Sequence, residues 1–436
     1  MVSPPTDEIL ELAAAARTLA PAPGDERYLA YCDALATGLD KHWDRVVQAN
    51  GDDLAAARER GLSPALLDRL AVDDGNLHQL VALAGQVGRA LPDVTRHGAV
   101  RPAAGDMRIR RIPKPIGVIF MIYEARPTVT IEGSLLPVAV GNAVILRGGT
   151  EMAATNAALG AIVRGAVDAA GLPPGMAQVI ADGDRALVRH LLKRHDAIDA
   201  LIPRGSPSLI DYCRTASTIP VIASGGGVNH LYVDDSAALD LAARIALDSK
   251  LAEPTACNTL EMVLAHRGVA ERLVRRLIHH GERLDEPYTL RLDGTLAGAL
   301  AGAVEDGADG GRRTRVRVLD PHDDGREFLD RSIAVRSVAG LDEAVAHIRR
   351  HGSRHTEGVV ATSPEVVAGF LRAVDAAALV VNGSLRLHDG PTMRLGPEIS
   401  ISTGRLHVRG PVGLSALLTY SWAIDGAGTL RGKDQP

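Results

Sequence analysis

Cys257 is the residue of this chain whose type and position best suit covalent chemistry. It lies in the phrase KLAEPTACNTLE (residues 250–261), between a helical pattern and a strand pattern, and this position predicts a loop. A thiol in such a loop can attack a carbonyl, hold the acyl group as a thioester and pass it to hydride, because sulfur is both a good nucleophile and a good leaving group. The alternative is a small buried apolar side chain, which is the commoner role of a lone cysteine.

The composition is typical of a globular protein and excludes several classes of partner. The chain has 436 residues, of which 46% are hydrophobic, enough for a large core and for more than one domain. Its 48 basic and 53 acidic residues are interspersed, so neither nucleic acid nor an anionic membrane is an expected partner. No run of about 18 apolar residues and no basic-then-apolar leader occurs. Three widely separated cysteines fit a reducing compartment, and we expect a cytoplasmic protein.

Two other kinds of chemistry find no support in the sequence. The histidines show no ligand spacing such as HExxH and the cysteines no CxxC pattern, so we expect no metal site. No GxSxG phrase occurs, which argues against a serine hydrolase.

The elements before Cys257 follow a strand and helix alternation. Residues 7–90 carry helical spacing, and a helix is expected over 236–251, with Asp235 or Ser236 as its cap. Between these helical segments lie short runs rich in valine and isoleucine, at 116–122, 143–146, 178–180, 197–202, 221–222 and 231–233. Such repetition indicates a parallel sheet covered on both faces.

A second alternation follows the cysteine. Strands are expected at 260–264, 333–338, 358–361 and 378–381, and helices at 269–279, 341–349 and 366–373. The sequence therefore predicts an α/β fold with two α/β domains in series.

Four phrases, taken in order, carry a resemblance to a known family. They are PIGVIFMIYEARP (115–127), GNAVILRGG (141–149), CNTLE (257–261) and ISISTGRLHVRGPVG (399–413). Together they resemble the γ-glutamyl phosphate reductases, or glutamate-5-semialdehyde dehydrogenases, of the aldehyde dehydrogenase superfamily. Similar stretches extend over roughly residues 10–430.

The resemblance implies an aldehyde dehydrogenase-like fold with two Rossmann-like α/β domains. A discontinuous dinucleotide-binding domain would comprise residues 1–100 and 119–250, and a catalytic domain with the nucleophilic cysteine would comprise residues 251–383. A hairpin at 101–118 and a tail at 384–436 would form a small oligomerisation element, so a homo-oligomer is expected.

The resemblance also implies the reaction. It is the NADPH-dependent reduction of L-glutamyl 5-phosphate to L-glutamate 5-semialdehyde and phosphate, a step of proline biosynthesis, through a thioester on Cys257. Many oxidising relatives use a glutamate to activate water, and alignment by eye places that position near Ser224, which is no base. This favours reduction over hydrolysis. Gly225–Gly227 beside it is explained equally well as a tight turn.

Further roles follow for residues that match the family phrases. For the dinucleotide we expect contacts from Arg147, Gly148, Gly149, Gly205, Ser206 and Glu327. A guanidinium suits a 2′-phosphate, which favours NADP over NAD, and free N–H groups at the start of a helix suit a pyrophosphate. The alternatives are a surface arginine at 147 and a solvated glutamate at 327.

For the substrate we expect a catalytic hydrogen-bond donor at Thr128 and binding contacts from Arg126, Asn258, His407 and Arg409. A structural role at an oligomer contact explains the last two equally well. Thr128 stands where the family usually has asparagine, and Pro397 where it usually has alanine. These departures leave open a paralogue that reduces a different acyl phosphate. A non-catalytic relative that binds a glutamate kinase is a second alternative, and transient contact with such a kinase is a possible partnership of the enzyme itself.

Overall fold

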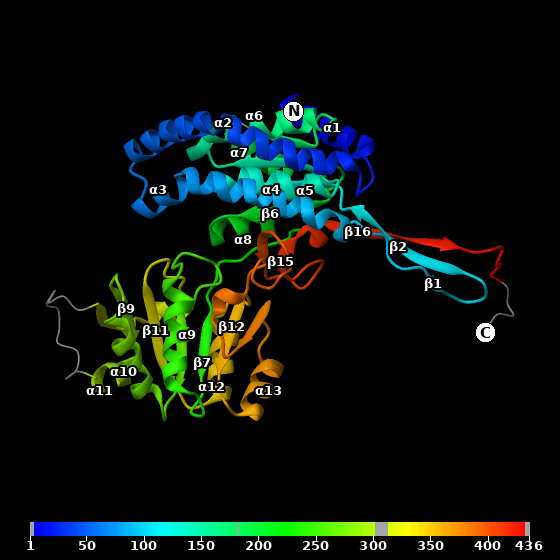
Figure 1. Cartoon of the computed structure of the whole chain (residues 1–436). Helices are drawn as coiled ribbons and strands as arrows, with labels where there is room; N and C mark the ends of the chain where they lie inside the picture. The colour runs from blue at the N-terminus through cyan, green and yellow to red at the C-terminus, as the bar shows by residue number, and fades with distance from the viewer. Residues whose placement is uncertain (1–3, 181–182, 301–312, 432–436) are drawn as a thin grey trace. The chain divides into compact units, whose positions relative to one another are not determined.

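The structure, a computed structural model, describes residues 4–180, 183–300 and 313–431. The chain divides into two compact units, whose elements are labelled in Figure 1. The first unit comprises residues 1–224, 395–400 and 411–436, and the second comprises residues 225–394 and 401–410. Among the described residues, no helix has the length and apolar character needed to span a membrane.

Helices open the first unit. They are α1 (Pro4–Leu19), α2 (Glu26–Glu59), α3 (Pro64–Leu70) and α4 (Asp74–Val94). The first-turn N–H groups of a helix need acceptors, and Asp25 supplies one at the start of α2, while Asp73 and Asn76 form a capping box on α4. A buried stripe along α2 packs against α4 and against α6 (Ala153–Ala169). The helical segment predicted for 7–90 is confirmed.

A parallel four-stranded sheet follows, in the order β5-β4-β3-β6. Its strands are β3 (Val118–Tyr123), β4 (Ala143–Gly148), β5 (Ala177–Val179) and β6 (Ala200–Arg204). All six residues of β3 are buried, which explains their continuous apolar run.

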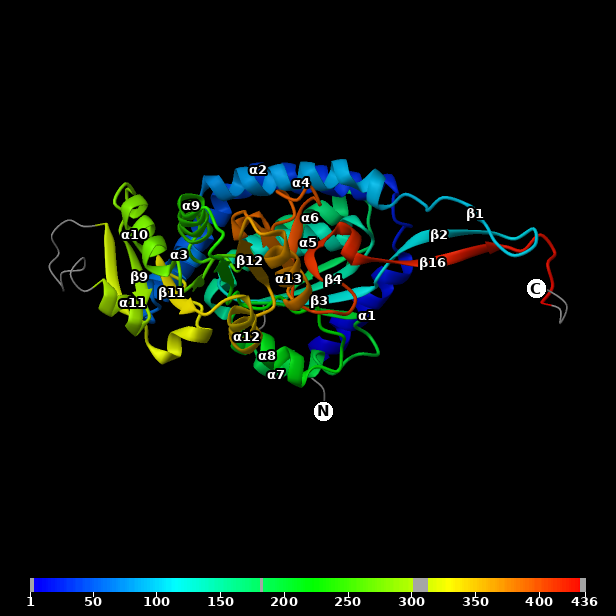
Figure 2. The same cartoon turned by 90° about the horizontal axis from the view of Figure 1, so that it is seen from below.

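The crossover helices cover both faces of this sheet. Because strand–helix–strand crossovers are right-handed, α5 (Thr128–Ala139) and α6 lie on one face and α7 (Arg185–Leu191) on the other. Figure 2 shows α2 and α4 beyond the first face, with α7 and α8 (Pro207–Ala216) on the opposite side. The carboxyl ends of β3, β4 and β6 meet at one edge, which is where parallel sheets bind ligands.

A projecting antiparallel sheet completes the first unit, formed by β1 (Arg101–Pro102), β2 (Arg108–Pro115) and β16 (Leu418–Asp425). It extends away from the helices of that unit in Figure 1. β16 is an edge strand and exposes Tyr420, Trp422 and Ile424. Of the tail that the sequence grouped with the hairpin, residues 418–425 pair with it in one sheet, whereas residues 384–394 and 401–410 belong to the second unit.

The second unit contains a seven-stranded parallel sheet in the order β10-β9-β11-β8-β7-β12-β13. Its strands are β7 (His230–Val233), β8 (Met262–His266), β9 (Tyr288–Leu292), β10 (Thr314–Val318), β11 (Ser332–Val338), β12 (Thr356–Val360) and β13 (Ala378–Val381). Its helices are α9 (Leu239–Leu251), α10 (Ala270–Gly281), α11 (Gly294–Ala299), α12 (Leu341–His351) and α13 (Pro364–Ala373). Two further strands, β14 (Glu398–Ser402) and β15 (Gly410–Gly413), pair with each other, and most of their residues belong to the first unit.

Successive residues of the central strands point to opposite faces of this sheet. Leu231 and Val233 pack with α9, α10 and α11, whereas Tyr232 between them packs with α12 and α13. Two apolar layers thus bury the strands on both sides, as the sequence predicted.

Three details of the prediction are wrong. The domain boundary at residue 250 is displaced to residues 224 and 225, because β7 hydrogen-bonds between β8 and β12 and α9 packs on that sheet. The run at 221–222 forms only an isolated bridge, from Leu201 to Val221. The expected cap of α9 is absent, because the N-cap residue is Ala238, which has no side-chain acceptor. Ser236 instead donates to Asp234, and its hydroxyl accepts from Thr362 N.

Candidate active site

Cys257 lies in a tight turn between the end of α9 and the start of β8. Backbone hydrogen bonds from Ala256 N to Glu253 O and from Thr259 N to Ala256 O shape the turn. The thiol-bearing residue is half-buried, whereas Cys32 and Cys213 are buried. The three cysteines all belong to the described residues and form no disulfide. The loop predicted for Cys257 is therefore confirmed.

A buried ion pair closes the base of this turn. Lys250, in the last turn of α9, donates through Nζ to both carboxylate oxygens of Glu261, at 2.9 and 2.8 Å. Glu261 also accepts from Phe328 N at 3.1 Å. The two side chains are 0% and 1% exposed, and burial raises the pKa of Glu261 to about 8, against the opposing effect of the ammonium group. The pair joins the two ends of the cysteine turn inside the core.

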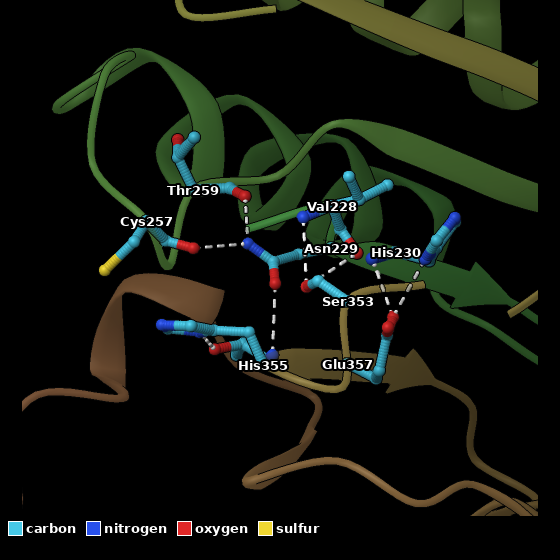
Figure 3. A network of polar contacts seen from close by, with 9 residues as sticks. Val228, Asn229, His230, Cys257, Thr259, Ser353, His355 and Glu357 are labelled. Carbon is cyan, nitrogen blue, oxygen red and sulfur yellow. Dashed lines mark hydrogen bonds and ion pairs between the residues drawn. The ribbon is translucent and has the colours of Figure 1, made fainter. Parts of the chain in front are cut away.

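Asn229 holds the turn from the side of β7 (Figure 3). Its Nδ2 donates to Cys257 O at 2.9 Å and to Thr259 O at 2.6 Å, and its Oδ1 accepts from Thr356 N at 3.0 Å. Gly227, two residues earlier, approaches the carbonyl of Cys257 so closely that a Cβ atom there would overlap its oxygen. Gly227 is not among the residues with positive φ, so its backbone conformation does not require glycine. Glycine is required here because a side chain would not fit against the Cys257 carbonyl.

Two predicted site residues adjoin the cysteine turn. Glu327 accepts from Gly227 N at 3.0 Å, so the structure brings this carboxylate to the segment that packs on Cys257. Asn258 is buried, and its Nδ2 donates to His388 O at 3.0 Å while its Oδ1 accepts from the guanidinium of Arg386. The contacts of the Asn258 side chain favour a structural role.

In the first unit, the phrase 123–128 forms the turn from β3 into α5. Thr128 is the first residue of α5 and is half-buried, as is Arg126. Ala125 has a φ of 43°, a left-handed conformation that costs a non-glycine residue about 1–3 kcal/mol and that is common at functional sites. Ala125 N donates to Glu151 at 2.7 Å, which holds the strained turn in place.

The predicted dinucleotide residues of this unit lie at the end of β4, directly after it, and directly after β6. Arg147 donates through Nη2 to Gly183 O at 3.1 Å, while its buried Nε makes no hydrogen bond to any described residue. Gly148 and Gly149 approach neighbouring side chains so closely that a Cβ atom would clash at either position. These glycines therefore shape the loop that follows β4.

The start of α8 already binds a carboxylate. Ser206 is the N-cap of α8 and Pro207 follows it, and Ser206 N donates to Glu124 Oε2 at 2.9 Å. A Cβ atom at Gly205 would collide with the same carboxylate. An anion thus occupies the position at which a helix start attracts a phosphate.

The two predicted site residues of the tail, His407 and Arg409, lie in the second unit. Arg409 pairs with Asp375 at 2.7 Å, and the two guanidinium groups of Arg405 and Arg409 lower the pKa of Asp375 to about 2. His407 is exposed and has a φ of 59°. Arg409 is thus engaged in an ion pair within the chain, which tests neither the predicted substrate contact nor the alternative role at an oligomer contact.

Comparison with known proteins shows the family to which the chain belongs. Residues 75–301 match the aldehyde dehydrogenase family. A gamma-glutamyl phosphate reductase of Sodalis glossinidius is 40% identical over 390 residues, which cover 89% of this chain and 90% of that protein. The chain belongs to the γ-glutamyl phosphate reductase family. The protein is an enzyme of this family, whose function lies in proline biosynthesis.

Two further relatives agree with this placement. A gamma-glutamyl phosphate reductase of Escherichia fergusonii is 39% identical over 406 residues, covering 92% of this chain and 93% of that protein. The crystal structure of a gamma-glutamyl phosphate reductase from Thermotoga maritima superposes with a TM-score of 0.88 at 31% identity, covering 98% of this chain and all of that one. The predicted aldehyde dehydrogenase-like fold is confirmed.

The sequence did not single out several residues that hold the candidate site together. Asn229 stands beside a short strand, where an asparagine is easily attributed to a turn. Lys250 and Glu261 bracket the cysteine phrase, and charged residues on either side of a loop usually indicate solvent. Glu124 lies inside a family phrase, but its bond to Ser206, 82 positions later, has no local signal.

Proposed function

We propose that the protein reduces L-glutamyl 5-phosphate to L-glutamate 5-semialdehyde and phosphate with NADPH, through a thioester on Cys257. Family membership supports the reaction. The observation that carries the role of Cys257 is its position in a half-buried turn whose backbone is fixed by Asn229, Gly227 and the Lys250–Glu261 pair.

The chemistry assigned to this chain's own residues begins at sulfur. The Cys257 thiolate attacks the acyl carbon, and the tetrahedral intermediate expels phosphate, so that a C–S bond replaces the C–O bond to the phosphoryl group. Thr128 is assigned as a donor to the carbonyl oxygen and Arg126 as a contact for the substrate's anionic groups. When bound, the reduced nicotinamide supplies the hydride that brings the acyl group to the aldehyde oxidation level. Cleavage of the C–S bond then releases the aldehyde and restores the thiolate.

The residues at the carboxyl ends of β4 and β6 fit a dinucleotide. The buried Nε of Arg147 is without a hydrogen-bond partner among the described residues, and the N–H group of Ser206 already binds a carboxylate. A guanidinium that offers several donors suits the 2′-phosphate of NADP. We assign Arg147, Gly148 and Gly149 to the adenosine end, Gly205 and Ser206 to the pyrophosphate, and Glu327 to the nicotinamide ribose.

Reduction in place of hydrolysis is supported by Ser224. Its hydroxyl is buried and donates to Pro203 O at 3.0 Å, and a hydroxyl cannot serve as the carboxylate base that activates water in oxidising relatives. The thioester is therefore expected to be reduced by hydride and not hydrolysed by water.

A homo-oligomer is the assembly that the projecting sheet favours. β16 is an eight-residue edge strand with aromatic side chains at Tyr420 and Trp422, over which the guanidinium of Arg111 lies at 4.4 and 5.0 Å from the ring centres. An exposed edge with a row of large side chains is usually covered by another chain. The cytoplasmic location and contact with a glutamate kinase stay predictions, as do substrate contacts from Asn258, His407 and Arg409.

The reverse reaction tests the proposal. Purified protein with NADP, phosphate and glutamate 5-semialdehyde should form NADPH, measured by absorbance, and Cys257→Ala should abolish the rate while nucleotide binding by calorimetry persists. Negligible turnover with this aldehyde but turnover with another would favour the paralogue, for which Thr128 and Pro397 are the motivating residues. Full activity of Cys257→Ala would overturn the thioester.

A further inference from the structure

A closed ring of hydrogen bonds includes the backbone of the cysteine turn, and it is buried except at the half-buried Cys257; all its members lie in the second unit. It runs from Cys257 O to Asn229 Nδ2 at 2.9 Å and from Asn229 Oδ1 to Thr356 N at 3.0 Å. It continues from Thr356 Oγ1 to His388 Nδ1 at 2.8 Å, and from His388 O to Asn258 Nδ2 at 3.0 Å. Because Asn258 follows Cys257 in the chain, the ring closes at the residue assigned as nucleophile.

Asn229 is the member of the ring with the most contacts to the turn. Its side-chain nitrogen donates to the main-chain carbonyls of Cys257 and Thr259. Its main-chain carbonyl accepts from the N–H groups of Glu261 and Met262 at 3.0 and 3.2 Å. The orientation of the amide follows from its partners, since the nitrogen faces two carbonyl oxygens and the oxygen faces an N–H group. Asn229 is 0% exposed, so water cannot replace these bonds without a change of structure.

The remaining members are equally enclosed. Thr356 is 0% exposed and His388 is 1% exposed, and each lies on a different segment, β12 and the stretch after β13. A second histidine, His355, contacts the same hydroxyl through Nδ1 at 2.7 Å. Three segments far apart in the sequence thus converge on one turn, as Figure 3 shows for Asn229, His355 and Cys257.

We infer that Asn229 and Thr356 are positioning residues for the Cys257 nucleophile: they fix the backbone from which the thiol projects, without contact to substrate. This inference rests on the proposed function of Cys257. A nucleophile must lie within a few tenths of an ångström of its productive position, and a displacement of about 1 Å costs about 10²-fold in rate. The ring supplies that constraint from both sides of the peptide that joins residues 257 and 258.

The chain contains a matched control for Asn229. Asn142, in the first unit, is also 0% exposed, and it donates through Nδ2 to two carbonyls, Pro137 O and Leu417 O, and accepts from Gly117 N at 2.9 Å. Truncation of either asparagine removes the same kinds of bond from a buried site. Only Asn229 contacts the cysteine turn.

The test compares Asn229→Ala with Asn142→Ala in steady-state kinetics and thermal unfolding of the full chain. Both variants should lower Tm by similar amounts. Asn229→Ala should lower kcat about 10- to 100-fold with KM for both substrates changed less than about threefold, whereas Asn142→Ala should keep kcat within about threefold of the parent. Equal kcat values for the two variants would overturn the inference.

A second pair of variants keeps the test decisive if Asn229→Ala does not fold. Thr356→Val removes the hydroxyl that joins His388 and keeps the backbone N–H that bonds Asn229, and should lower kcat about 3- to 10-fold. Thr356→Ser restores the hydroxyl and should restore kcat, whereas a purely structural role would change Tm without this pattern. If Cys257→Ala loses activity but the Asn229 and Thr356 variants keep the parent kcat, only the positioning role is rejected. If Cys257→Ala stays active, the proposed function itself is rejected.

Discussion

Gly227→Ala is the substitution for which the structure makes the sharpest prediction. An ideal Cβ atom at this position would overlap the carbonyl oxygen of Cys257 and would also lie 2.7 Å from Asn229 Nδ2. Both neighbours are held in the buried hydrogen-bond ring, so neither can yield as a flexible side-chain end can. Restoring van der Waals separation requires the cysteine turn to move by about 1 Å or more.

The expected cost falls on turnover. A displacement of about 1 Å at a nucleophile lowers the rate about 10²-fold, which corresponds to about 2.7 kcal/mol in the activation barrier. We therefore expect kcat for NADPH formation in the reverse reaction to fall about 100-fold. The dinucleotide residues assigned to the first unit are unchanged, and only Glu327, which accepts from Gly227 N, adjoins the substitution. The affinity for the dinucleotide, measured by calorimetry, should therefore change much less than kcat.

Gly165→Ala is the control. Gly165 lies in α6, and a Cβ atom there would meet nothing within 4 Å. The alanine should leave kcat unchanged and raise stability by up to about 1 kcal/mol, because alanine has the higher helix propensity. Wild-type kcat in Gly227→Ala would refute the close approach of Gly227 to the cysteine turn, since the added methyl group could then be accommodated without displacing it.

Three further predictions concern ionisable side chains: a buried ion pair, a carboxylate at the start of α8 and a buried histidine. Lys250→Met leaves Glu261 buried without its cation and should lower the free energy of unfolding by about 3–5 kcal/mol in urea titrations, and a loss below 1 kcal/mol would contradict the structural role of the pair. Glu124→Gln removes the negative charge that bonds Ser206 N, where we assign the pyrophosphate, so KM for NADP should fall about fivefold, the equivalent of about 1 kcal/mol; a higher KM would count against that assignment. Burial lowers the pKa of His388 to about 4 from an ordinary value of 6.5, so the folded protein keeps this ring neutral and loses stability as pH falls from 6.5 toward 4. The loss should be up to about 1.4 kcal/mol per pH unit, and His388→Gln should remove that part of the slope in unfolding measured across this window, whereas an unchanged slope would show that the ring titrates normally.

Local pattern was sufficient for most elements and for the loop that contains Cys257, whereas the assignment of that cysteine as nucleophile came from the family resemblance. The buried run of β3 and the alternation of the second unit's central strands follow from period and composition, which are properties of neighbouring residues. The turn at Cys257 could be predicted because a helical pattern ends at Pro254 and an apolar run begins after it. The edge strand β10 and its neighbour β9 were missed, because the arginines within them reduce the apolar signal.

Membership of sheets was decided by tertiary structure. β7 precedes α9 and Cys257, so its position in sequence grouped it with the first domain, yet its backbone pairs with β8 and β12. Hydrogen bonding between strands depends on which edges meet in space, and a sequence read along the chain contains no record of those partners.

The residues that hold the cysteine turn in place could likewise not be predicted from local sequence pattern. The sequence by itself determined that a thiol stands in a loop between a helix and a strand, because local periodicity and the proline before it specify that loop. Only the tertiary structure decided that Asn229, Thr356 and His388 hold its backbone, since these bonds span up to 130 positions and each partner is, in its own segment, an ordinary polar residue. Such contacts form when the sheet brings their segments together, and their energy depends on burial that the folded core alone creates.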